Sequence, residues 1–415
     1  MAVYGQVAGA TNSLTNNKKV KLVAANVADS RIFTKASVSK MKASDFEGKK
    51  YGKSYTLYIP GKPKLVNGVV ANPSDIVEVE TQVFLDNDNV STTLGPWQRL
   101  GDVESFQNEV AGPWALTLGR GQEKKIVANE IFKAMIAVVA PKTSQALDGA
   151  SFDVLGKTTA KLRKLAISSG LTGFLDPEVR SEIAGKGLDK FIPSEKMAAI
   201  YGEANIGRYG TADWAETPDL PVVVTPASAA TASITLTNAQ DANGNNLPWF
   251  ETVTSVTGTN LFKGAIFNVA GLKIVDCSGI ETEVPVQVVV LSANGAGTSG
   301  TISPLRIAEH GETGNNPNAW VATGTSSLTL TYALGTSKTY VVNEVRTKDC
   351  FAYDTYQFDV LPGSQDEMVS TVGGSSVKMR IFGDGTNLDK LVRIDSTYAA
   401  SLYEPREAAL IYVEA

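Results

Sequence analysis

The chain has 415 residues, 43% of them apolar and 20% charged, which excludes a wholly disordered polypeptide and allows a sizeable core. Its 38 Lys and Arg stand against 43 Asp and Glu, and the net charge of −5 excludes a basic surface over the whole chain. No apolar run approaches the roughly 20 residues that cross a bilayer, and the first residues lack a secretory pattern. We therefore expect a protein made in the cytoplasm, with no membrane partner.

The rare residue types limit the chemistry that the chain can perform. The one histidine, His310, excludes zinc centres built from several histidines, and no Gly-x-Ser-x-Gly elbow accompanies it for a Ser-His-Asp triad. Its polar surroundings predict a surface loop position. The two cysteines, Cys277 and Cys350, are too few for a disulfide framework, and we expect buried, reduced thiols. We nominate no catalytic residue, no cofactor site and no metal ligand.

The N-terminal part of the chain predicts an arm and a projecting loop. Residues 1–48 are polar and weakly periodic, which is typical of an extended arm. Alternating apolar residues then predict two strands, at 54–59 and 77–83, and the segment between them is dense in Pro, Gly, Asn and Asp. Because a two-stranded hairpin is only marginally stable alone, we expect this loop to lean on another surface.

The densest basic cluster of the sequence lies around this loop and has two interpretations. It consists of Lys49, Lys50, Lys53, Lys62 and Lys64, interleaved with Tyr51, Tyr55 and Tyr58. Phosphate contacts combined with stacked aromatic rings would suit a nucleic acid. A solvated loop that meets a partner protein would use the same residues, and we favour this second interpretation.

Helical signals follow the loop. Pro113 occupies a favoured first-turn position and predicts a long helix, with an apolar stripe at helical spacing, that runs to about Val139 and stops before Pro141. The other elements predicted here are a short helix capped by Asp102, a helix over 151–168, a strand over 171–175 and a helix from Asp176 to about Ala184. The pattern is that of a mixed α and β core.

From residue 226 to residue 345 charges thin out, and Thr, Ser, Gly, Ala, Asn and Val dominate. Turn clusters separate about seven short β runs, which predict a barrel or a sandwich. The runs are Ser233–Thr237, Thr252–Val256, Ala265–Val269, Leu272–Val275, Val284–Leu291, Ser327–Tyr332 and Thr339–Val342. Beyond them, a hairpin is predicted around Asp384-Gly385 between strands at 377–382 and 391–394, and a terminal strand at 408–413. We expect this module to be inserted into a second domain.

Three acidic runs resemble cation sites at first sight: Asp86–Asn89, Asp241–Asn246 and Asp384–Asp389. Each departs from the calcium-loop pattern. The twelfth position counted from Asp241, for example, is Thr252 rather than glutamate. We predict a hairpin turn for each run.

The order of elements resembles that of the major capsid (coat) proteins of tailed bacteriophages with the Hong Kong 97-type fold. The likeness is carried by the arm, the long helix, the loop with Tyr58-Ile59-Pro60, and the runs Gly173–Pro177, Asn205–Gly210, Leu220-Pro221 and Lys348–Tyr353. Within this family the chain is most similar to the coat proteins of Salmonella-type short-tailed phages, which carry an extra β-barrel in the apical domain. The stretches Gly264–Lys273 and Gln287–Leu291 carry that closer likeness.

The resemblance implies an α+β fold in four parts. They are an N-terminal arm (1–48), an extended two-stranded loop (49–92), capsid-core domains with a spine helix, a peripheral sheet and an apical domain (93–225 and 346–415), and an inserted β-barrel (226–345). The chain would then be a non-enzymatic, self-assembling structural protein of the icosahedral virion capsid, assembled in the host bacterial cytoplasm. The arm lacks a charged helical scaffold pattern, which implies a separate scaffolding protein.

The resemblance also implies partners. They are copies of the chain in hexamers and pentamers, the scaffolding protein, a portal protein at one vertex, in some shells a decoration protein, and enclosed double-stranded DNA that is not read by sequence. Two other classes stay open on the residues alone. One is a bacterial surface or adhesion protein with an Ig-like β module, and the other is a carbohydrate-active hydrolase.

Two sets of residues are expected to make contacts between subunits. Lys62 and Lys64 lie at the tip of the two-stranded loop and are predicted to meet acidic groups of an adjacent subunit. A polar loop in the β module contributes little to a core, so contact with a neighbouring capsomer is its expected use. The residues of this second set are Asp241, Asn243, Asn245 and Asn246.

Overall fold

The computed structural model describes residues 16–40, 54–59, 78–94, 112–167, 170–187, 207–276, 278–356, 366–372, 374–383 and 390–415. Several predictions fall outside these residues: the helix capped by Asp102, the turn at Asp384–Asp389, Cys277, and the loop tip with Lys62 and Lys64. The chain divides into two compact units, each described by itself. Unit 1 comprises Met1–Tyr55, Val83–Ile126 and Ala352–Ser401, and unit 2 comprises Thr56–Gln82, Val127–Phe351 and Leu402–Ala415.

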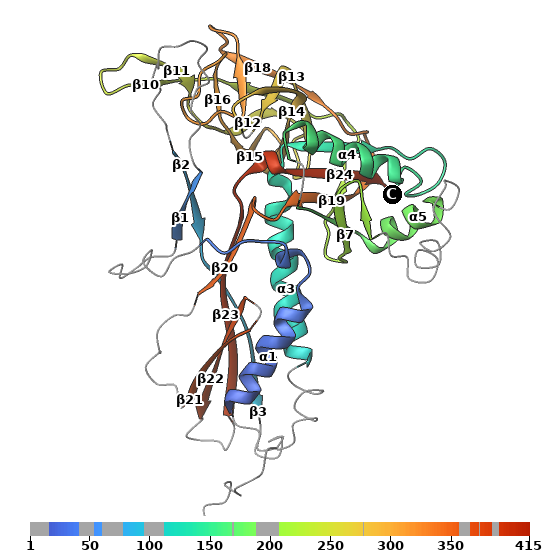
Figure 1. Ribbon diagram of the computed structural model, residues 1–415, viewed down its shortest axis with the longest axis vertical. Coiled ribbons are helices and arrows are strands. Elements are labelled where there is room, and N and C mark those ends of the chain that lie inside the picture. Colours follow the sequence, from blue (N-terminus) through green and yellow to red (C-terminus); the bar gives the residue numbers. More distant parts are fainter. Residues whose placement is uncertain are drawn as a thin grey trace, which may run out of the picture. The chain divides into compact units, whose positions relative to one another are not determined.

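A five-stranded sheet forms the framework of unit 1 (Figure 1). Its order is β20 (Phe351–Tyr356), β23 (Lys390–Leu402), β22 (Ser375–Gly383) and β21 (Asp366–Val372), with β3 (Asp86–Leu94) also paired to β23. The strands predicted at 377–382 and 391–394 are confirmed as parts of β22 and β23. The turn predicted at Asp86–Asn89 is wrong, because these residues lie in β3 and pair with Ser396, Thr397 and Tyr398 of β23, among others.

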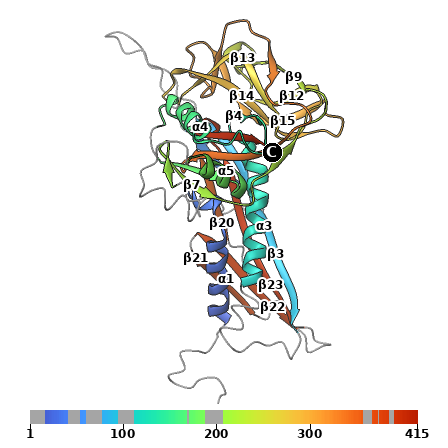
Figure 2. The ribbon, with the colours of Figure 1, turned by 90° about the vertical axis from the view of Figure 1, so that its right-hand side faces the viewer.

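Two helices, α1 (Asn16–Ser30) and α3 (Gly112–Glu130), pack on this sheet, as both views show (Figures 1 and 2). The prediction of an extended arm is therefore wrong for residues 16–30. Val20, Val23 and Val27 recur at helical spacing, and they are buried in a core that also contains Leu118 of α3 and residues of β22 and β23. This apolar stripe is short and consists of small residues among lysines and asparagines. Its helical periodicity is therefore weak in the sequence.

The long helix ends earlier than predicted. α3 stops at Glu130, a short 3-10 helix η4 (Ile131–Lys133) follows, and the next residues form strand β4 (Ile136–Ala140). β4 pairs in parallel with the C-terminal strand β24 (Ala408–Glu414). The apolar residues at positions 135–140 therefore lie in or next to a sheet strand rather than on the stripe of a helix. Pairing with β24 outweighs the local helical pattern.

A seven-stranded sheet forms one part of unit 2. It follows the order β4-β24-β19-β5-β7-β6, with β8 paired to β19; the further strands are β5 (Leu171–Leu175), β6 (Arg208–Tyr209), β7 (Ala212–Glu216), β8 (Val222–Val224) and β19 (Thr339–Thr347). The predicted strand at 171–175 and the predicted terminal strand are confirmed, and the helices predicted over 151–168 and from Asp176 are confirmed as α4 (Phe152–Lys164) and α5 (Pro177–Gly187). The Ser151 side chain caps α4 by accepting a hydrogen bond from the Val154 amide.

The other part of unit 2 is a barrel of six antiparallel strands, closed because β18 pairs with β13 as well as with β9. Around the ring, the strands are β13 (Ile266–Val275), β14 (Glu281–Ala293), β15 (Ser299–Leu305), β12 (Val253–Thr259), β9 (Thr231–Thr235) and β18 (Ser327–Tyr332). The strands β10 (Asn238–Gln240), β11 (Asn246–Phe250), β16 (Ile307–Glu309) and β17 (Ala319–Val321) extend the sheet from β13.

Most of the β runs predicted for this region are strands of the barrel. The runs at 265–269 and 272–275 are one strand, β13, whose pairing with β14 shifts register around Gly271, a residue with φ of 76°. The prediction is wrong for Thr339–Val342, which begins β19 of the seven-stranded sheet. There it pairs with β24 and β8.

The barrel and the seven-stranded sheet share one apolar core within unit 2. A single cluster of buried residues runs from Leu171 and Ile411 of the sheet to Phe267 and Val286 of the barrel. Polar contacts join the same two parts, since the Tyr412 hydroxyl donates to the Gly264 carbonyl across 3.0 Å. In the part of the chain that the structure describes, no helix is long and apolar enough to span a membrane.

Candidate functional site

The predicted capsomer contact lies at the tip of the β10–β11 hairpin. One Asp241 carboxylate oxygen accepts hydrogen bonds from the amides of Asn243 and Asn245, each at 2.8 Å, and the other accepts from the Asn245 side chain at 2.9 Å. These donors, the Asn245 side chain first, hold the pKa of Asp241 below its usual range. Gly244, with φ of 82°, supplies the left-handed residue that closes the turn.

The hairpin turn predicted for Asp241–Asn246 is thus confirmed, and the structure brings the four predicted residues of this set together. The turn from Ala242 to Asn246 is exposed. Both Asp241 oxygens are occupied by N–H donors, and no cluster that could hold a metal ion occurs among the described residues. The loop therefore presents amides in a preformed arrangement, which suits hydrogen bonding to another surface.

The base of the two-stranded loop is described, although its tip is not. β1 (Ser54–Ile59) and β2 (Val79–Phe84) pair with each other, which confirms the two predicted strands. Tyr58 is 58% exposed and Phe84 is 65% exposed. Tyr55 is buried, and its hydroxyl donates to the Asp354 carboxylate at 2.7 Å, so it cannot stack on a base. The described residues of the loop thus offer exposed aromatic side chains, one on each strand.

A buried polar network in unit 1, which the sequence did not reveal, anchors the segment after α1. Arg31 is buried and donates to the hydroxyls of Ser375, at 2.7 Å, and Tyr353, and to the Gln122 side chain. The Glu123 carboxylate accepts from the backbone amides of Ile32 and Thr34 at 2.8 to 3.0 Å. Burial raises the pKa of Glu123 although these donors and Arg31 oppose the rise.

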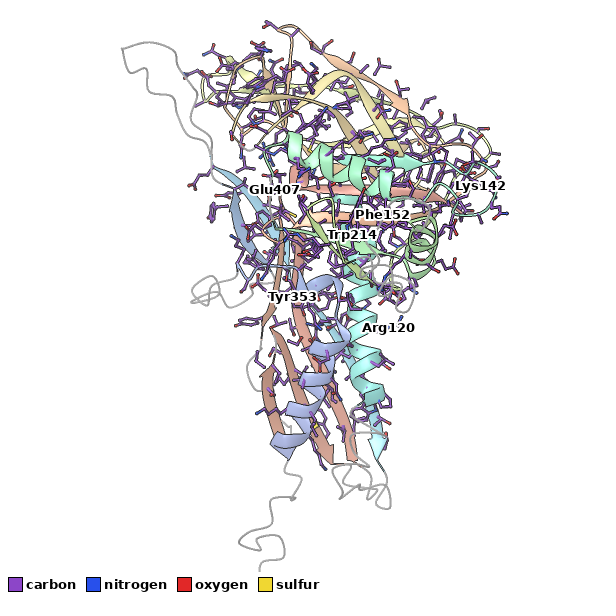
Figure 3. All side chains as sticks on the ribbon, turned by 45° about the vertical axis from the view of Figure 1, so that its right-hand side comes forward. Arg120, Lys142, Phe152, Trp214, Tyr353 and Glu407 are labelled. Atoms are coloured by element: carbon purple, nitrogen blue, oxygen red, sulfur yellow. The ribbon has the colours of Figure 1, made fainter. Side chains whose placement is uncertain are left out.

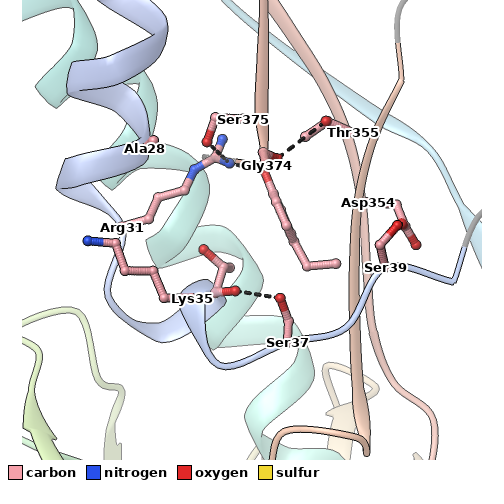
Figure 4. A pocket seen from close by; sticks show the side chains of 11 residues that line it. Ala28, Arg31, Lys35, Ser37, Ser39, Asp354, Thr355, Gly374 and Ser375 are labelled. Atoms are coloured by element: carbon pink, nitrogen blue, oxygen red, sulfur yellow. Dashed lines mark hydrogen bonds between the residues drawn. The ribbon is translucent and has the colours of Figure 1, made fainter. Parts of the chain in front are cut away.

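Asp354 extends this network at the other end of a cavity of about 330 Å³ (Figure 4). It accepts from the Ser39 hydroxyl at 2.5 Å and from the Lys40 amide at 3.2 Å. Figure 4 shows Arg31 and Ser375 on one side of the cavity and Ser39 with Asp354 on the other. These polar groups hydrogen-bond to one another. We therefore infer that they hold residues 31–40 against the rest of unit 1.

The rare residues lie as predicted where the structure describes them. The His310 side chain is 74% exposed, with its Nε2 atom 3.5 Å from the Glu281 carboxylate, so the surface prediction is confirmed. Cys350 is buried and free, and burial raises the pKa of its thiol. Its Sγ atom lies 3.2 Å from the Thr347 carbonyl oxygen. Among the described residues, neither side chain belongs to a group of His, Cys, Asp and Glu that could hold a metal ion.

Comparison with known proteins gives structural likeness only. No protein-family model and no curated protein matches the chain. Among solved structures it is similar to the capsid of Ralstonia phage GP4 (6% identity, TM-score 0.46, 92% of this chain and 87% of that one). It is also similar to the capsid structure of the cyanophage P-SCSP1u (11%, 0.45, 99% and 92%) and to a structure from Mycobacterium phage Che8 (10%, 0.44, 92% and 90%). All three TM-scores are below 0.5.

Proposed function

We propose that the chain is the major capsid protein of a tailed double-stranded-DNA bacteriophage, a shell subunit that performs no catalysis. The observation that carries the proposal is the two-stranded sheet β1–β2, which exposes Tyr58 and Phe84. A two-stranded sheet is marginally stable alone, so such a sheet gains burial against a neighbouring molecule. Copies of the same chain, packed edge to edge in a shell, supply that neighbour.

The division into parts follows the predicted one. We propose an N-terminal arm (1–48), an extended loop (49–92), a capsid core (93–225 and 346–415) and an inserted barrel (226–345), in the manner of the Salmonella-type coat proteins. The insertion is supported by the seven-stranded sheet, which takes strands from both sides of the barrel in the chain. Since β19 begins at Thr339 and belongs to that sheet, the barrel's own strands end at Tyr332.

The proposed partners are copies of the chain in hexamers and pentamers, a separate scaffolding protein, a portal protein at one vertex, in some shells a decoration protein, and enclosed DNA. The contacts between subunits use Lys62 and Lys64 at the loop tip and the turn at Asp241–Asn246. Each exposed ion pair would contribute only about 0–1 kcal/mol, but it would recur throughout the shell. The proposed location is the virion capsid, after assembly in the host bacterial cytoplasm.

Electron microscopy of the purified protein tests the proposal. We expect uniform closed shells when the chain is expressed with its scaffolding protein, and monomers, capsomers or aberrant shells without it. Uniform shells from the chain alone would contradict the separate scaffold. Monodisperse particles under every condition would contradict the shell function and favour an adhesion protein or a hydrolase. Lys62→Glu combined with Lys64→Glu should lower particle yield without changing the melting temperature of the monomer.

A further inference from the structure

Helices α1 and α3 pack against each other in unit 1. The two helices lie side by side in both views (Figures 1 and 2). They come close at Gly119, where an added Cβ atom would lie 2.0 Å from the Ser30 hydroxyl oxygen. We call the exposed residues of α1, of the 3-10 helix η1 (Phe33–Lys35) and of α3 the α1–α3 face.

This face is basic, although the chain is acidic. In the part of the chain that the structure describes, its exposed charged residues are the cations Lys21, Lys35, Arg120, Lys124 and Lys125 and the single carboxylate of Asp29. Lys125 is paired with Asp88 of β3. Figure 3 shows Arg120 at the surface of α3. The face therefore carries a positive charge while the whole chain carries −5.

We propose that the α1–α3 face binds the phosphate backbone of double-stranded DNA without reading its sequence. The identity of this polyanion rests on the proposed function, because the shell encloses such DNA. The cations of α3 lie at positions 120 to 125, which extend over about 8 Å at 1.5 Å per residue. Duplex DNA carries one negative charge per roughly 1.7 Å of its axis, so a segment of this length presents about four or five charges to these cations.

The chemistry of the face favours a duplex over the other polyanions. Phe33 is buried and Trp114 is half-buried, so the described helices expose no aromatic ring on which an unpaired base could stack. Leu116 is the one large apolar side chain exposed on them. An acidic protein segment would need a buried apolar or aromatic anchor to bind tightly, whereas a regular line of phosphates needs only spaced cations.

The expected binding is weak for one copy and strongly dependent on salt. The logarithm of the binding constant falls with the logarithm of the salt concentration with a slope of about −0.9 for each phosphate neutralised. Four contacts would give a slope near about −3.6, so raising salt from about 50 to about 200 mM would lower the affinity by roughly 100-fold. In a shell, many copies would contact one DNA molecule, which offsets the weakness of each contact.

Fluorescence anisotropy of a labelled DNA duplex, titrated with the full unassembled chain at several salt concentrations, tests the inference. The test variant carries Lys21→Gln, Lys35→Gln and Lys124→Gln, all at exposed positions. We expect its slope to be shallower than that of the original chain by about 3 units, close to loss of binding. The control variant carries the same charge change on unit 2, as Lys142→Gln, Lys164→Gln and Lys263→Gln, and should keep the original slope.

Several outcomes would overturn the inference. They are no duplex binding at about 50 mM salt, an equal loss in the control variant, and stronger binding of poly-glutamate than of the duplex. The assay does not depend on shell formation, so its failure is separable from that of the proposed function. A chain that forms shells without binding the duplex contradicts this inference alone. A chain that binds the duplex through this face but never forms shells supports the face and contradicts the shell function.

Discussion

Units 1 and 2 are stabilised by different kinds of contact. In unit 2, one apolar cluster continues from the seven-stranded sheet through the barrel, with Ile411, Phe267 and Ile302 among its members. In unit 1 the apolar cluster is smaller, and the segment that follows α1 is held by buried hydrogen bonds to Arg31, Glu123 and Asp354. Apolar contacts are non-directional and shared among many residues, whereas a buried polar group depends on particular partners.

The difference teaches where each unit is sensitive to mutation. Truncating one residue of the shared core should weaken the barrel and the sheet together, because both lose the same packing. Removing one polar residue of unit 1 should release the segment that follows α1 and leave the five-stranded sheet intact. The reason is that only the few donors bonded to that residue lose their acceptor. Five changes test this contrast, ordered by their expected effect on stability.

Phe267→Ala in β13 is expected to cause the largest loss. The ring is buried in the shared core, 5.7 Å from the Tyr332 ring centroid, and Phe→Ala changes in cores cost about 3–5 kcal/mol. We expect amide hydrogen exchange to accelerate in β19 and β24 as well as in the barrel. Phe267→Leu is the milder control. Faster exchange confined to the barrel strands would show that the two parts do not share stability.

Asp354→Ala should have a large but local effect in unit 1. The change leaves three donors without their acceptor: the Ser39 hydroxyl, the Lys40 amide and the Tyr55 hydroxyl. Tyr55 is buried whereas Ser39 and Lys40 are exposed, so at about 1–3 kcal/mol for an unsatisfied buried group we expect a loss of up to about 3 kcal/mol in all. Limited proteolysis should open the chain near residues 36–40. Asp354→Asn, which keeps one acceptor oxygen, should lose less, and equal losses would contradict the assignment of the carboxylate as the anchor.

Glu344→Gln tests a buried ion pair of β19, that of Glu344 with Arg346, through its dependence on pH. Burial raises the pKa of Glu344 to about 7, although Arg346, at 2.9 Å, opposes the rise. The unfolded carboxyl has a pKa of about 4.3, so the folded chain binds more protons between these values. Its contribution to stability is complete below about pH 4.3 and is lost as the pH rises to about 7, up to about 3 kcal/mol.

Urea unfolding across this pH range should therefore show that Glu344→Gln removes part of the decline. A loss of stability that is the same at every pH would contradict the raised pKa of Glu344, because an effect that depends on its ionisation must change with pH. Glu283→Gln is the matched control of opposite sign, because the hydrogen bond and charge of Lys273 lower the pKa of Glu283. A decline with pH that survives in Glu344→Gln would contradict the assignment.

Gly119→Ala should destabilise the contact between α1 and α3. The new methyl group would lie 2.0 Å from the Ser30 Oγ atom and 3.3 Å from the Val27 carbonyl oxygen, so α1 must shift. Overpacking of this kind costs about 1–3 kcal/mol. Adding Ser30→Ala should recover part of the loss. Gly121→Ala is the control on the same helix, since nothing lies within 4 Å of its Cβ position, and it should stabilise by up to about 1 kcal/mol.

The same contrast explains which elements could be predicted from the sequence. Strands such as Leu171–Leu175 and turns such as Asp241–Asn246 depend on residues that are close in the chain, and local pattern was sufficient for them. The end of α3 and the strand at Asp86–Leu94 depend on β24 and β23, which come hundreds of residues later. Local propensity cannot show a partner strand so far along the chain. The sequence therefore predicts a helix where β4 lies and a turn where β3 begins, and both predictions are wrong.

The residues of the candidate sites also differ in whether their partners are close or distant in the sequence. Asp241, Asn243 and Asn245 could be predicted because an aspartate followed by the pair Asn243-Gly244 is a local turn signal. The anchor of unit 1 was not found, because Arg31 and Ser375 are separated by 344 positions and Arg31 and Gln122 by 91. An arginine followed by a polar segment carries no sign of its distant hydroxyl partners. Only the folded chain shows that they meet.

Replacing Asp241–Asn246 with a short Gly-Ser turn should have the smallest effect on stability, while its effect on assembly should be large. The turn is mostly exposed, and its hydrogen bonds are made within itself or with the adjacent Gln240, so we expect a loss of at most about 1 kcal/mol. If the preformed amides of this turn contact a neighbouring capsomer, the yield or thermal stability of shells should fall while the unassembled chain melts as before. The turn Asn294–Thr298 between β14 and β15, which is mostly exposed and in which the Asn294 side chain bonds to Thr298, is the matched control. Shells indifferent to the replacement, or equally impaired by the same replacement in the control turn, would remove the hairpin from the set of subunit contacts.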